Sequence, residues 1–426
     1  MAGFLLLIVA GALLLMVFNA RTRPLRFVDA LFTSTSAVCV TGLVVVDTGK
    51  DLAPASQAVV LLLIQLGGIG VMTATTALSL LMRERIGLRQ RMFFAGGFGM
   101  ETPAGVVRFL RRILLLTFTV EAAGAVFLYA GFLRAGFSPL RSLCNAVFHS
   151  ISAFCNAGFS LFSDSLAGFS RTFLIPGTVM ALIVVGGLGF MVLSELMITV
   201  RRREKLSMLP RLVLFTTAGL LLFGLFSITL SEWNHAFAGM SGGWKIWNGL
   251  FASVTPRTAG FDTVPPATFS SAGIFILVLL MIIGASPGST GGGFKTTTLA
   301  VLLVSTWNNL RKSPEINLWN RRISIRILQR TVTVVVLYLG TIGLGLAALS
   351  LLEPFSFRSL LFETVSAMGT VGLSLGITPE LSDAGKIVLM LLMFWGRVGI
   401  VTFLYGLLKP VAKGKVSYPD AEIPIG

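Results

Sequence analysis

Long apolar segments alternate with shorter amphipathic ones along this chain, in an order that repeats four times. An apolar segment of roughly 20 residues can span a membrane as a helix, and eight segments of this kind are present. Each pair of them encloses a stretch too short to span, which predicts a half-length helix. In chain order, the predicted helix, half-helix and return helix are 3–18, 25–37 and 56–81; 109–133, 140–153 and 172–200; 211–230, 244–254 and 272–307; and 331–352, 357–367 and 386–408.

The fold expected from this order is an all-α integral membrane protein with eight spanning helices around one central pore. Irregular backbone is tolerated at membrane depth only where it is buried in protein or lines water. We therefore expect the loops that follow the half-helices to lie on the pore axis. The expected modules are 1–82, 108–200, 211–310 with a broken return helix, and 331–408, followed by a cytoplasmic tail at 409–426.

A short motif marks the end of every half-helix. Its glycine recurs at positions 42, 158, 260 and 372, at spacings of 116, 102 and 112 residues. A serine stands six residues before three of these glycines and a phenylalanine ten residues before them, namely Ser36, Ser152 and Ser366, and Phe32, Phe148 and Phe362. The third copy departs from the others at Pro256 and Arg257. Repetition at this interval indicates four copies of one module.

The extended loop around each glycine offers the ligands that a dehydrated monovalent cation requires. Such an ion is held by a ring of backbone carbonyl oxygens, and glycine permits the conformations that aim carbonyls at one axis. The partially negative C-terminal ends of the half-helices would also favour a cation. The predicted selectivity filter consists of the carbonyls of Val40, Thr41 and Gly42; Asn156, Ala157 and Gly158; Thr258, Ala259 and Gly260; and Thr370, Val371 and Gly372. A helix-packing role for these small-residue triplets is the alternative, which four copies make less favoured.

Composition agrees with a membrane protein. Hydrophobic residues form 54% of the chain and charged residues 12%, whereas about a quarter of the residues in soluble domains are charged. The net charge of +16 would suggest nucleic acid in a soluble protein, but 21 of the 34 Lys and Arg residues follow return segments in four clusters. By the positive-inside rule the clusters at 83–112, 201–211, 311–330 and 409–415 are cytoplasmic, and the filter loops face outward. No nucleic-acid partner is expected.

A glycine-rich stretch interrupts the third return segment at 284–296. Pro287 removes a helix hydrogen bond and five nearby glycines weaken the rest, which predicts a break halfway through the membrane. A kinked helix without a gating role is the alternative. The spacing from Gly288 to Gly293 also approaches that of a phosphate-binding loop. However, Phe294 separates the last glycine from Lys295, and no strand precedes the loop, so an ATPase is disfavoured.

Three ionisable residues lie inside or near apolar segments. Arg397 lies deep in the last one, where an arginine is costly and normally faces a partner inside the bundle. A structural pairing of Arg397 with a helix-end carbonyl is one interpretation. Glu121 and Glu195 could join an ion path, although pairing near a helix end is favoured for both.

The other ionisable groups give weaker signals. Asp47, Asp164 and Asp262 follow filters one to three and could raise the local cation concentration at the pore mouth. His149 and His235 have no companions at metal-ligand spacing, so no transition-metal site is expected. The sequence shows no nucleophile with an adjacent base and no paired His and carboxylates, so transport is favoured over catalysis.

The filters resemble those of the Trk/Ktr/HKT superfamily of potassium transporters, most closely its bacterial Ktr branch. The matching motifs are Val-Cys-Val-Thr-Gly-Leu at 38–43, Cys-Asn-Ala-Gly-Phe at 155–159, Pro-Arg-Thr-Ala-Gly-Phe at 256–261 and Gly-Thr-Val-Gly-Leu at 369–373. The resemblance extends to Gln-Leu-Gly-Gly-Ile-Gly at 65–70 and to the tail that closes with Ile425-Gly426. No extra helix pair precedes the first module, which is similar to the Ktr branch rather than the Trk branch.

This resemblance implies potassium uptake by a single-chain pore that is not an enzyme and carries no organic cofactor. In plant relatives a serine at the first filter glycine accompanies sodium preference, so Gly42 implies potassium. Sodium dependence is expected, and a sodium or mixed sodium/potassium transporter of the same fold is the alternative. The broken third return helix is implied to be the gate, with a positive barrier beside it; the gate residues are Gly284, Pro287, Gly288, Gly291, Gly292, Gly293, Lys295 and Arg397.

The resemblance also implies a bacterial plasma (inner) membrane location, a homodimer and a cytoplasmic ring of nucleotide-binding regulatory subunits. The basic loops, above all 311–330, and the polar tail would suit such a ring. Nucleotide would then bind the ring and not this chain. Anionic membrane lipid is the competing partner for the same positive charges.

Overall fold

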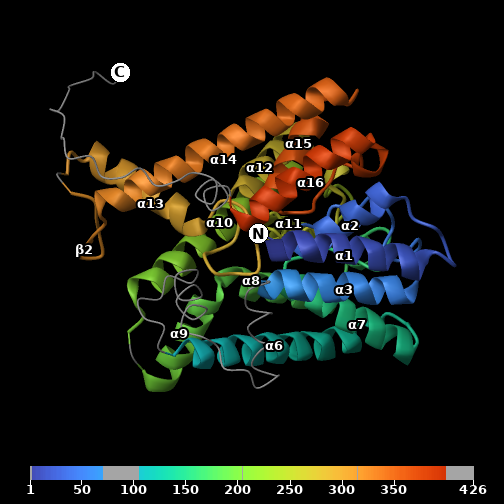
Figure 1. Ribbon diagram of the computed structural model, residues 1–426. Helices are drawn as coiled ribbons and strands as arrows, with labels where there is room; N and C mark the ends of the chain where they lie inside the picture. The colour runs from blue at the N-terminus through green and yellow to red at the C-terminus, as the bar shows by residue number, and fades with distance from the viewer. Residues whose placement is uncertain (1, 71–104, 204, 314, 400–426) are drawn as a thin grey trace.

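The computed structural model describes residues 2–70, 105–203, 205–313 and 315–399, and in these ranges the chain is mostly helical (Figure 1). The predicted helical fold is therefore confirmed. The α-helices are α1 (Ala2–Asn19), α2 (Phe27–Cys39), α3 (Pro54–Ile69), α6 (Val106–Arg134), α7 (Pro139–Phe154), α8 (Leu174–Leu188), α9 (Phe190–Arg202), α10 (Met208–Glu232), α11 (Gly242–Val254), α12 (Ser271–Ile282), α13 (Thr296–Leu310), α14 (Ile325–Leu352), α15 (Phe357–Gly369) and α16 (Asp383–Val398). Single 3-10 turns are η1 (Ala167–Phe169), η2 (Pro266–Thr268) and η3 (Thr378–Glu380).

One element was not expected in an all-α protein. The strands β1 (Asn317–Leu318) and β2 (Arg321–Arg322) form a short antiparallel hairpin between α13 and α14, with Asn317 opposite Arg322. Trp319 and Asn320, which connect the strands, both have positive φ angles. The hairpin lies in the basic stretch at 311–330, outside the apolar segments from which the fold was predicted. The pattern of apolar residues therefore gave no indication of it.

Helix length and surface composition fit a membrane protein. In the described residues, three helices are long and apolar enough to cross a membrane: Val107–Arg134, Met208–Glu232 and Ile325–Leu352. The bent pair α8 and α9 would make a fourth span. Large apolar side chains point outward from the long helices; Phe226, Leu344 and Leu351 are 70%, 76% and 88% exposed. Such surface is costly in water and is favourable against lipid.

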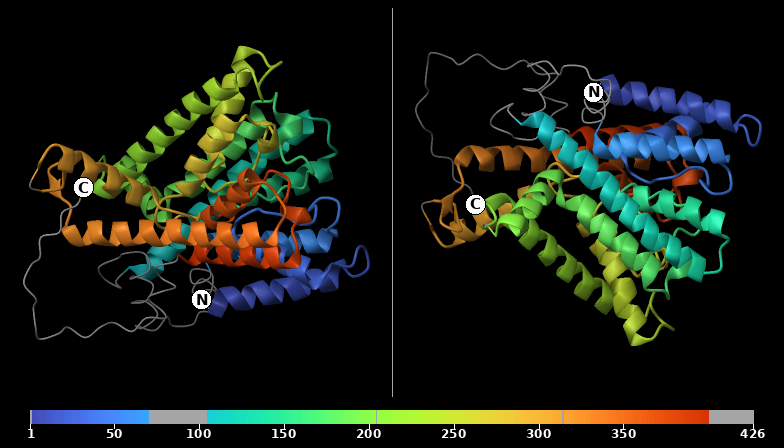
Figure 2. Two further views of the ribbon diagram at one scale, coloured as in Figure 1. Left: turned by 90° about the horizontal axis from the view of Figure 1, so that it is seen from above. Right: turned by 90° about the horizontal axis from the view of Figure 1, so that it is seen from below.

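The helices pack in a closed order that follows the sequence repeats. Return helices α3, α8, α12 and α16 contact the half-helices α7, α11, α15 and α2 respectively. The last repeat therefore meets the first, and α16 lies beside the N-terminal helices in the views of Figure 2. Lys386 of α16 binds Asp29 of α2 at 2.8 Å in a largely buried ion pair, and Arg26 pairs with Asp383 at the same seam.

The prediction of a continuous second return helix over 172–200 is wrong. The helix breaks at Gly189, and α8 and α9 meet there at 97°. Gly189 has φ +93° and ψ 142°, which no α-helix contains. Gly70 and Gly399 end α3 and α16 in nearly the same conformation, so these helices end before the return helices expected over 56–81 and 386–408 do. The remainders at 71–81 and 400–408, and the tail at 409–426, lie outside the described residues.

A buried polar side chain joins the first helix of three repeats to the start of the return helix. Glu353, at the end of α14, accepts hydrogen bonds from the backbone N–H (3.0 Å) and hydroxyl (2.6 Å) of Ser382. Glu232, at the end of α10, accepts equivalent bonds from Ser270. In the first repeat Asn19 accepts from the N–H of Ala53 at 2.7 Å. These bonds satisfy orphan donors at helix N-termini and fix the loops that carry the site.

Candidate ion pathway and gate

The half-helices end in the same unusual backbone conformation. The residue two positions before each repeat glycine has a left-handed φ, although none of the four is glycine: Val40 at 57°, Asn156 at 58°, Thr258 at 65° and Thr370 at 50°. A non-glycine residue in this region is uncommon and costs about 1 kcal/mol or more. The same strain at the same place in four repeats shows that the chain turns sharply there for a shared reason.

The four repeat glycines surround one axis. They have φ values of 93°, 70°, 73° and 92° in chain order. A methyl group added to Gly42 would lie 2.5 Å from the carbonyl oxygen of Ala157, and one added to Gly158 would lie 2.8 Å from that of Ala259. One added to Gly260 would meet the Val371 oxygen at 2.5 Å, and one added to Gly372 would clash with the Thr41 oxygen.

This pattern of near contacts has a cyclic order. The glycine of each repeat faces the carbonyl oxygen from the residue before the next glycine, from the first repeat to the fourth and back to the first. Four backbone strands therefore approach one another closely enough that only glycine fits between them. A ring of carbonyl oxygens in a constriction without side chains can replace the water shell of a monovalent cation.

Hydroxyl groups near the C-terminal ends of the half-helices form hydrogen bonds with the backbone of these strands. Ser36 and Ser366 accept hydrogen bonds from the N–H of Gly42 and Gly372, at 3.0 and 3.1 Å. Ser152 instead donates to the carbonyl of Phe159 at 2.8 Å. In the third repeat, Thr255 donates to the carbonyl of Phe261. The sequence marked the three serines by their constant offset but did not indicate that they brace the backbone.

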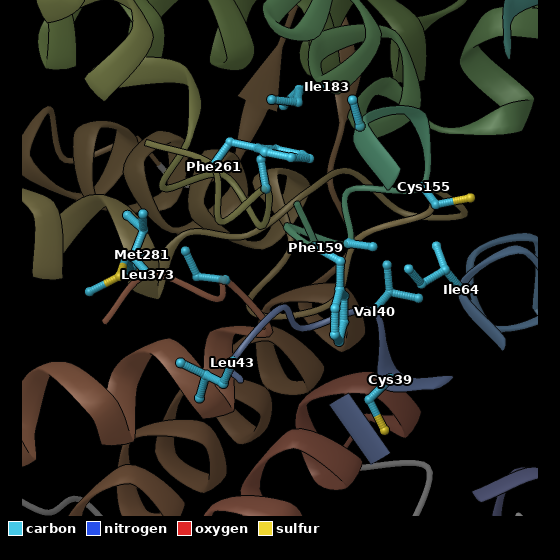
Figure 3. Packing of buried hydrophobic residues seen from close by; sticks show 14 of the residues in the cluster. Cys39, Val40, Leu43, Ile64, Cys155, Phe159, Ile183, Phe261, Met281 and Leu373 are labelled. Carbon is cyan, nitrogen blue, oxygen red and sulfur yellow. The ribbon is translucent and has the colours of Figure 1, made fainter. Parts of the chain in front are cut away.

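A large apolar residue follows each glycine and anchors the strand outside the ring. These residues are at most 2% exposed and belong to the hydrophobic core shown in Figure 3: Leu43, Phe159, Phe261 and Leu373. Burying each side chain stabilises the strand by about 2 kcal/mol. Two kinds of contact thus fix the strands that carry the ring carbonyls: packing of the buried apolar side chains, and hydrogen bonds between hydroxyl groups and the strand backbone.

A cavity of about 480 Å³ opens above the glycines. All four glycines line it, together with Asp47, Asp51 and Asp262. Asp47 accepts from the N–H groups of Gly49 and Lys50, and Asp51 pairs with Arg23. One carboxylate oxygen of Asp262 has no hydrogen-bond partner in the described structure. Asp164 is not part of this lining; it accepts from the N–H of Gly168.

If the cavity is a cation entrance, acidification is expected to weaken cation binding there. Burial, together with a smaller contribution from the nearby charge of Asp164, raises the pKa of the Asp262 carboxyl to about 6. The carboxylate is therefore charged at pH 7.5 and neutral at pH 5. Loss of one charge beside a cation path, worth about 1 kcal/mol, corresponds to a roughly fivefold higher apparent KM. Cation uptake measured between pH 5 and pH 7.5 tests this expectation. In Asp262→Asn the apparent KM should be high and should not change with pH. If the KM of this variant still depends on pH as in the unmodified chain, Asp262 is not the group responsible.

The third return helix is interrupted directly beneath the ring. Residues 283–295 connect α12 and α13 without helical structure, and Gly284 bonds across the loop to the Phe294 carbonyl at 2.8 Å. The loop touches the filter region, because the N–H of Gly292 donates to the Thr370 hydroxyl at 3.1 Å. A methyl group added to Gly291 would clash with the Thr258 hydroxyl.

The loop also binds the breaks of two other return helices. Ser286 donates to the Gly187 carbonyl at 3.0 Å, and Phe190, at the start of α9, donates to the Gly288 carbonyl at 2.9 Å. Gly293 donates to the carbonyl of Gly396 on α16 at 3.3 Å. The glycine breaks in α8/α9 and α16 therefore free backbone groups that hold the loop.

The two predicted cationic gate residues bind backbone carbonyls. The guanidinium of Arg397 donates to Thr290 in the loop and to Gly67 and Gly68 at the end of α3. Lys295 donates within the loop, to Gly291 at 2.9 Å and Gly292 at 3.2 Å. Arg397 therefore makes the helix-end pairing that was one interpretation, and it contacts the loop as well. Its planar fork suits two carbonyl partners at once.

The glutamates considered for an ion path are paired elsewhere. Glu121 accepts from the Gln65 amide at 3.1 Å, between α6 and α3. Glu195 accepts from the N–H and hydroxyl of Ser207, immediately before α10, at 2.6 and 2.9 Å. The expected pairing near a helix end thus describes Glu195. No cluster of metal-ligating side chains is found in the part of the chain that the structure describes.

The fold and site define a membrane protein in which four backbone strands form one narrow ring above an interrupted helix. The model of the cation transport protein family TrkH matches residues 2–409. This chain therefore belongs to the TrkH family and is a cation transport protein, not an enzyme.

Curated relatives match over the full chain. The Ktr system potassium uptake protein B of Bacillus subtilis is 37% identical and is covered over 95% of its length. The potassium/sodium uptake protein NtpJ of Enterococcus hirae is 35% identical, with 96% covered. The crystal structure of the potassium transporter TrkH from Vibrio parahaemolyticus superposes with a TM-score of 0.74 at 20% identity, covering 96% of this chain and 85% of that one, which supports the fold.

Proposed function

We propose that this chain takes up potassium across the bacterial plasma membrane through a single pore formed by its four repeats. The cyclic contact between each repeat glycine and the carbonyl of the next strand supports this most directly. Twelve backbone carbonyls would form the filter: those of Val40, Thr41 and Gly42; Asn156, Ala157 and Gly158; Thr258, Ala259 and Gly260; and Thr370, Val371 and Gly372. Potassium is the substrate and is held without a transition metal or organic cofactor.

The proposal includes eight spans and an outward-facing filter. The modules would be 1–82, 108–200, 211–310 and 331–408, with the tail at 409–426 on the cytoplasmic side. Asp47, Asp51 and Asp262 line the cavity next to the repeat glycines. Their negative charge would suit a cation entrance. The basic hairpin region at 311–330 would face the cytoplasm by the positive-inside rule.

The interrupted third return helix would be the gate. Its loop contacts the hydroxyl of Thr370 from below the ring and is held by Arg397 and by glycine breaks in two return helices. A loop bound by backbone hydrogen bonds can be released by a modest shift of those helices. The proposed gate residues are Gly284, Pro287, Gly288, Gly291, Gly292, Gly293, Lys295 and Arg397.

The alternative is a sodium or mixed sodium/potassium transporter of the same fold. The name of the Enterococcus hirae relative includes both ions, whereas those of the Bacillus subtilis and Vibrio alginolyticus relatives include potassium alone. Gly42 favours potassium by resemblance, because plant relatives with sodium preference carry serine at this position. A side chain there would also displace a carbonyl of the ring. Uptake of potassium that depends on sodium belongs to the proposal.

Two kinds of partner complete the proposal. A homodimer with a cytoplasmic ring of nucleotide-binding subunits would regulate the gate, and the "Ktr system" names of relatives suggest a multi-component system. Both residues of β2, Arg321 and Arg322, are exposed and would offer positive charge to that ring. Anionic membrane lipid competes for the same surface.

The function is tested by cation influx into proteoliposomes that contain the purified chain. We expect potassium influx well above that of empty liposomes and at least about tenfold above sodium influx under matched gradients. Equal influx of both ions would favour the mixed transporter. Absence of any cation influx, with or without the regulatory ring added, would refute the pore.

A further inference from the structure

Two buried ionisable residues occupy the same position in opposite repeats of the ring. His149 on α7 and Glu363 on α15 each stand nine residues before the repeat glycine, and both are 0% exposed. In the cyclic order of the strands, the second and fourth repeats lie across the axis from each other. Burying such groups is costly unless they are hydrogen-bonded, so each calls for a partner.

His149 binds the strand that leaves the second filter segment. Its Nδ1 lies 2.7 Å from the Asn145 carbonyl, which requires a proton on Nδ1. Its Nε2 lies 3.0 Å from the hydroxyl of Ser160, two residues after Gly158, and that hydroxyl in turn accepts from the N–H of Phe162. The ring of Phe162 stacks on the imidazole with centroids 5.1 Å apart.

Glu363 makes the equivalent connection in the fourth repeat. Its carboxylate accepts from the hydroxyl of Ser374, which is two residues after Gly372. It also accepts from the N–H of Leu375 at 3.2 Å and from the hydroxyl of Thr378 at 2.9 Å. Three donors from one loop therefore converge on one buried side chain, which satisfies the carboxylate and fixes the loop.

The other two repeats lack this connection. The equivalent of His149 and Glu363 in the first repeat is Thr33, whose hydroxyl donates to the Asp29 carbonyl of its own helix at 2.8 Å. In the third repeat the position is taken by Phe251, which has no polar group. Two residues after the repeat glycine, these repeats carry Val44 and Asp262 in place of serine. We call the hydrogen bond from the half-helix residue to the serine two positions after the repeat glycine the clamp. It joins His149 to Ser160 and Glu363 to Ser374, and is therefore specific to one diagonal of the ring.

We propose that His149 and Glu363 are positioning residues that set the carbonyl spacing of the second and fourth filter strands and thereby the choice between potassium and sodium. The inference rests on the proposed function. The serine lies two residues from the repeat glycine, so its position is transmitted through two peptide units to the carbonyls of the ring. Discrimination between ions of different radius requires that these carbonyls be held at a fixed separation.

The test compares potassium and sodium influx for paired variants in proteoliposomes. His149→Phe keeps an aromatic ring beside Phe162 and removes the hydrogen bond, whereas His149→Gln retains a polar end that can reach Ser160. Glu363→Ala removes all three acceptor bonds, and Glu363→Gln retains an acceptor for part of them. We expect the potassium-to-sodium influx ratio to fall by about tenfold in His149→Phe and Glu363→Ala, with partial recovery in both Gln variants.

Controls separate positioning from general stability. Thr33→Val changes the equivalent residue of a repeat without the clamp and should leave the influx ratio unchanged. A lower melting temperature with an unchanged ratio in the His149 and Glu363 variants would overturn the inference. If His149→Phe or Glu363→Ala fails to fold, Ser160→Ala and Ser374→Ala remove the same hydrogen bonds from the partner side. Wild-type ratios in both serine variants would overturn the inference too. Failure of the proposed function itself is distinguishable, since the unmodified chain would then show no potassium influx.

Discussion

Replacement of Gly42 by serine is expected to lower potassium influx by about tenfold or more and to bring the potassium-to-sodium influx ratio close to one. Gly42 has φ +93°, a conformation that costs a residue with a side chain about 1–3 kcal/mol. In addition, the new Cβ would lie 2.5 Å from the carbonyl oxygen of Ala157. That oxygen or the strand of Gly42 must move, and either movement breaks the ring.

A matched glycine controls for backbone strain in this experiment. Gly136, between α6 and α7, has φ +88° and nothing within 4 Å of an added Cβ. Gly136→Ser therefore carries the conformational cost without displacing a carbonyl, and its influx ratio should equal that of the unmodified chain. Equal ratios in Gly42→Ser and Gly136→Ser would show that Gly42 does not line the ion path, and the repeats would then be helix-packing sites.

The ends of the half-helices could be located from the sequence because their signal is repeated. A glycine at four equivalent places, with serine and phenylalanine at constant offsets, located the ends of the half-helices. The interruption of the third return helix was also expected, since Pro287 and several glycines lie together there. Each of these signals is local in the chain, so no knowledge of tertiary contacts is needed to recognise it.

The sequence missed features whose meaning depends on neighbours far along the chain. Gly70, Gly189 and Gly399 lie in apolar runs where glycine is common in membrane helices, so the breaks were not distinguished from packing sites. His149 was assigned no role, because its partner Ser160 is reached only after the strand turns back beside α7. Glu232 resembles a solvated loop charge until Ser270 is placed against it.

The three unpredicted breaks and the predicted loop belong to one arrangement. The loop at 283–295 donates hydrogen bonds to carbonyls near the ends of α8 and α16, and Arg397 joins it to the end of α3. A movement of any of these three return helices would therefore alter the support of the loop. If the loop is the proposed gate, this connection would give the proposed regulatory partner a physical route to it, through helix ends and not through the proposed filter.

Removal of Arg397 is expected to raise potassium influx by about tenfold in the absence of a regulatory partner. The guanidinium binds the Thr290 carbonyl of the loop and the carbonyls of Gly67 and Gly68. Each hydrogen bond from a charged donor contributes about 1.5–3 kcal/mol, so its loss shifts a closed loop toward open states by about tenfold or more. Arg397→Ala also removes a positive charge from beneath the ring. Influx assays on proteoliposomes with matched protein content measure the change.

Two further variants decide how Arg397 acts. Arg397→Lys keeps the charge but cannot bind carbonyls of α3 and the loop with a planar fork, so high influx in this variant would identify the tether as the closing element. Low influx in Arg397→Lys and high influx in Arg397→Gln would identify the charge. Lys386→Met is the control, because it removes a buried cation from the same helix at the Asp29 pair, away from the loop. If Arg397→Ala lowers stability as Lys386→Met does and leaves influx unchanged, Arg397 is a helix-end partner without a role in gating.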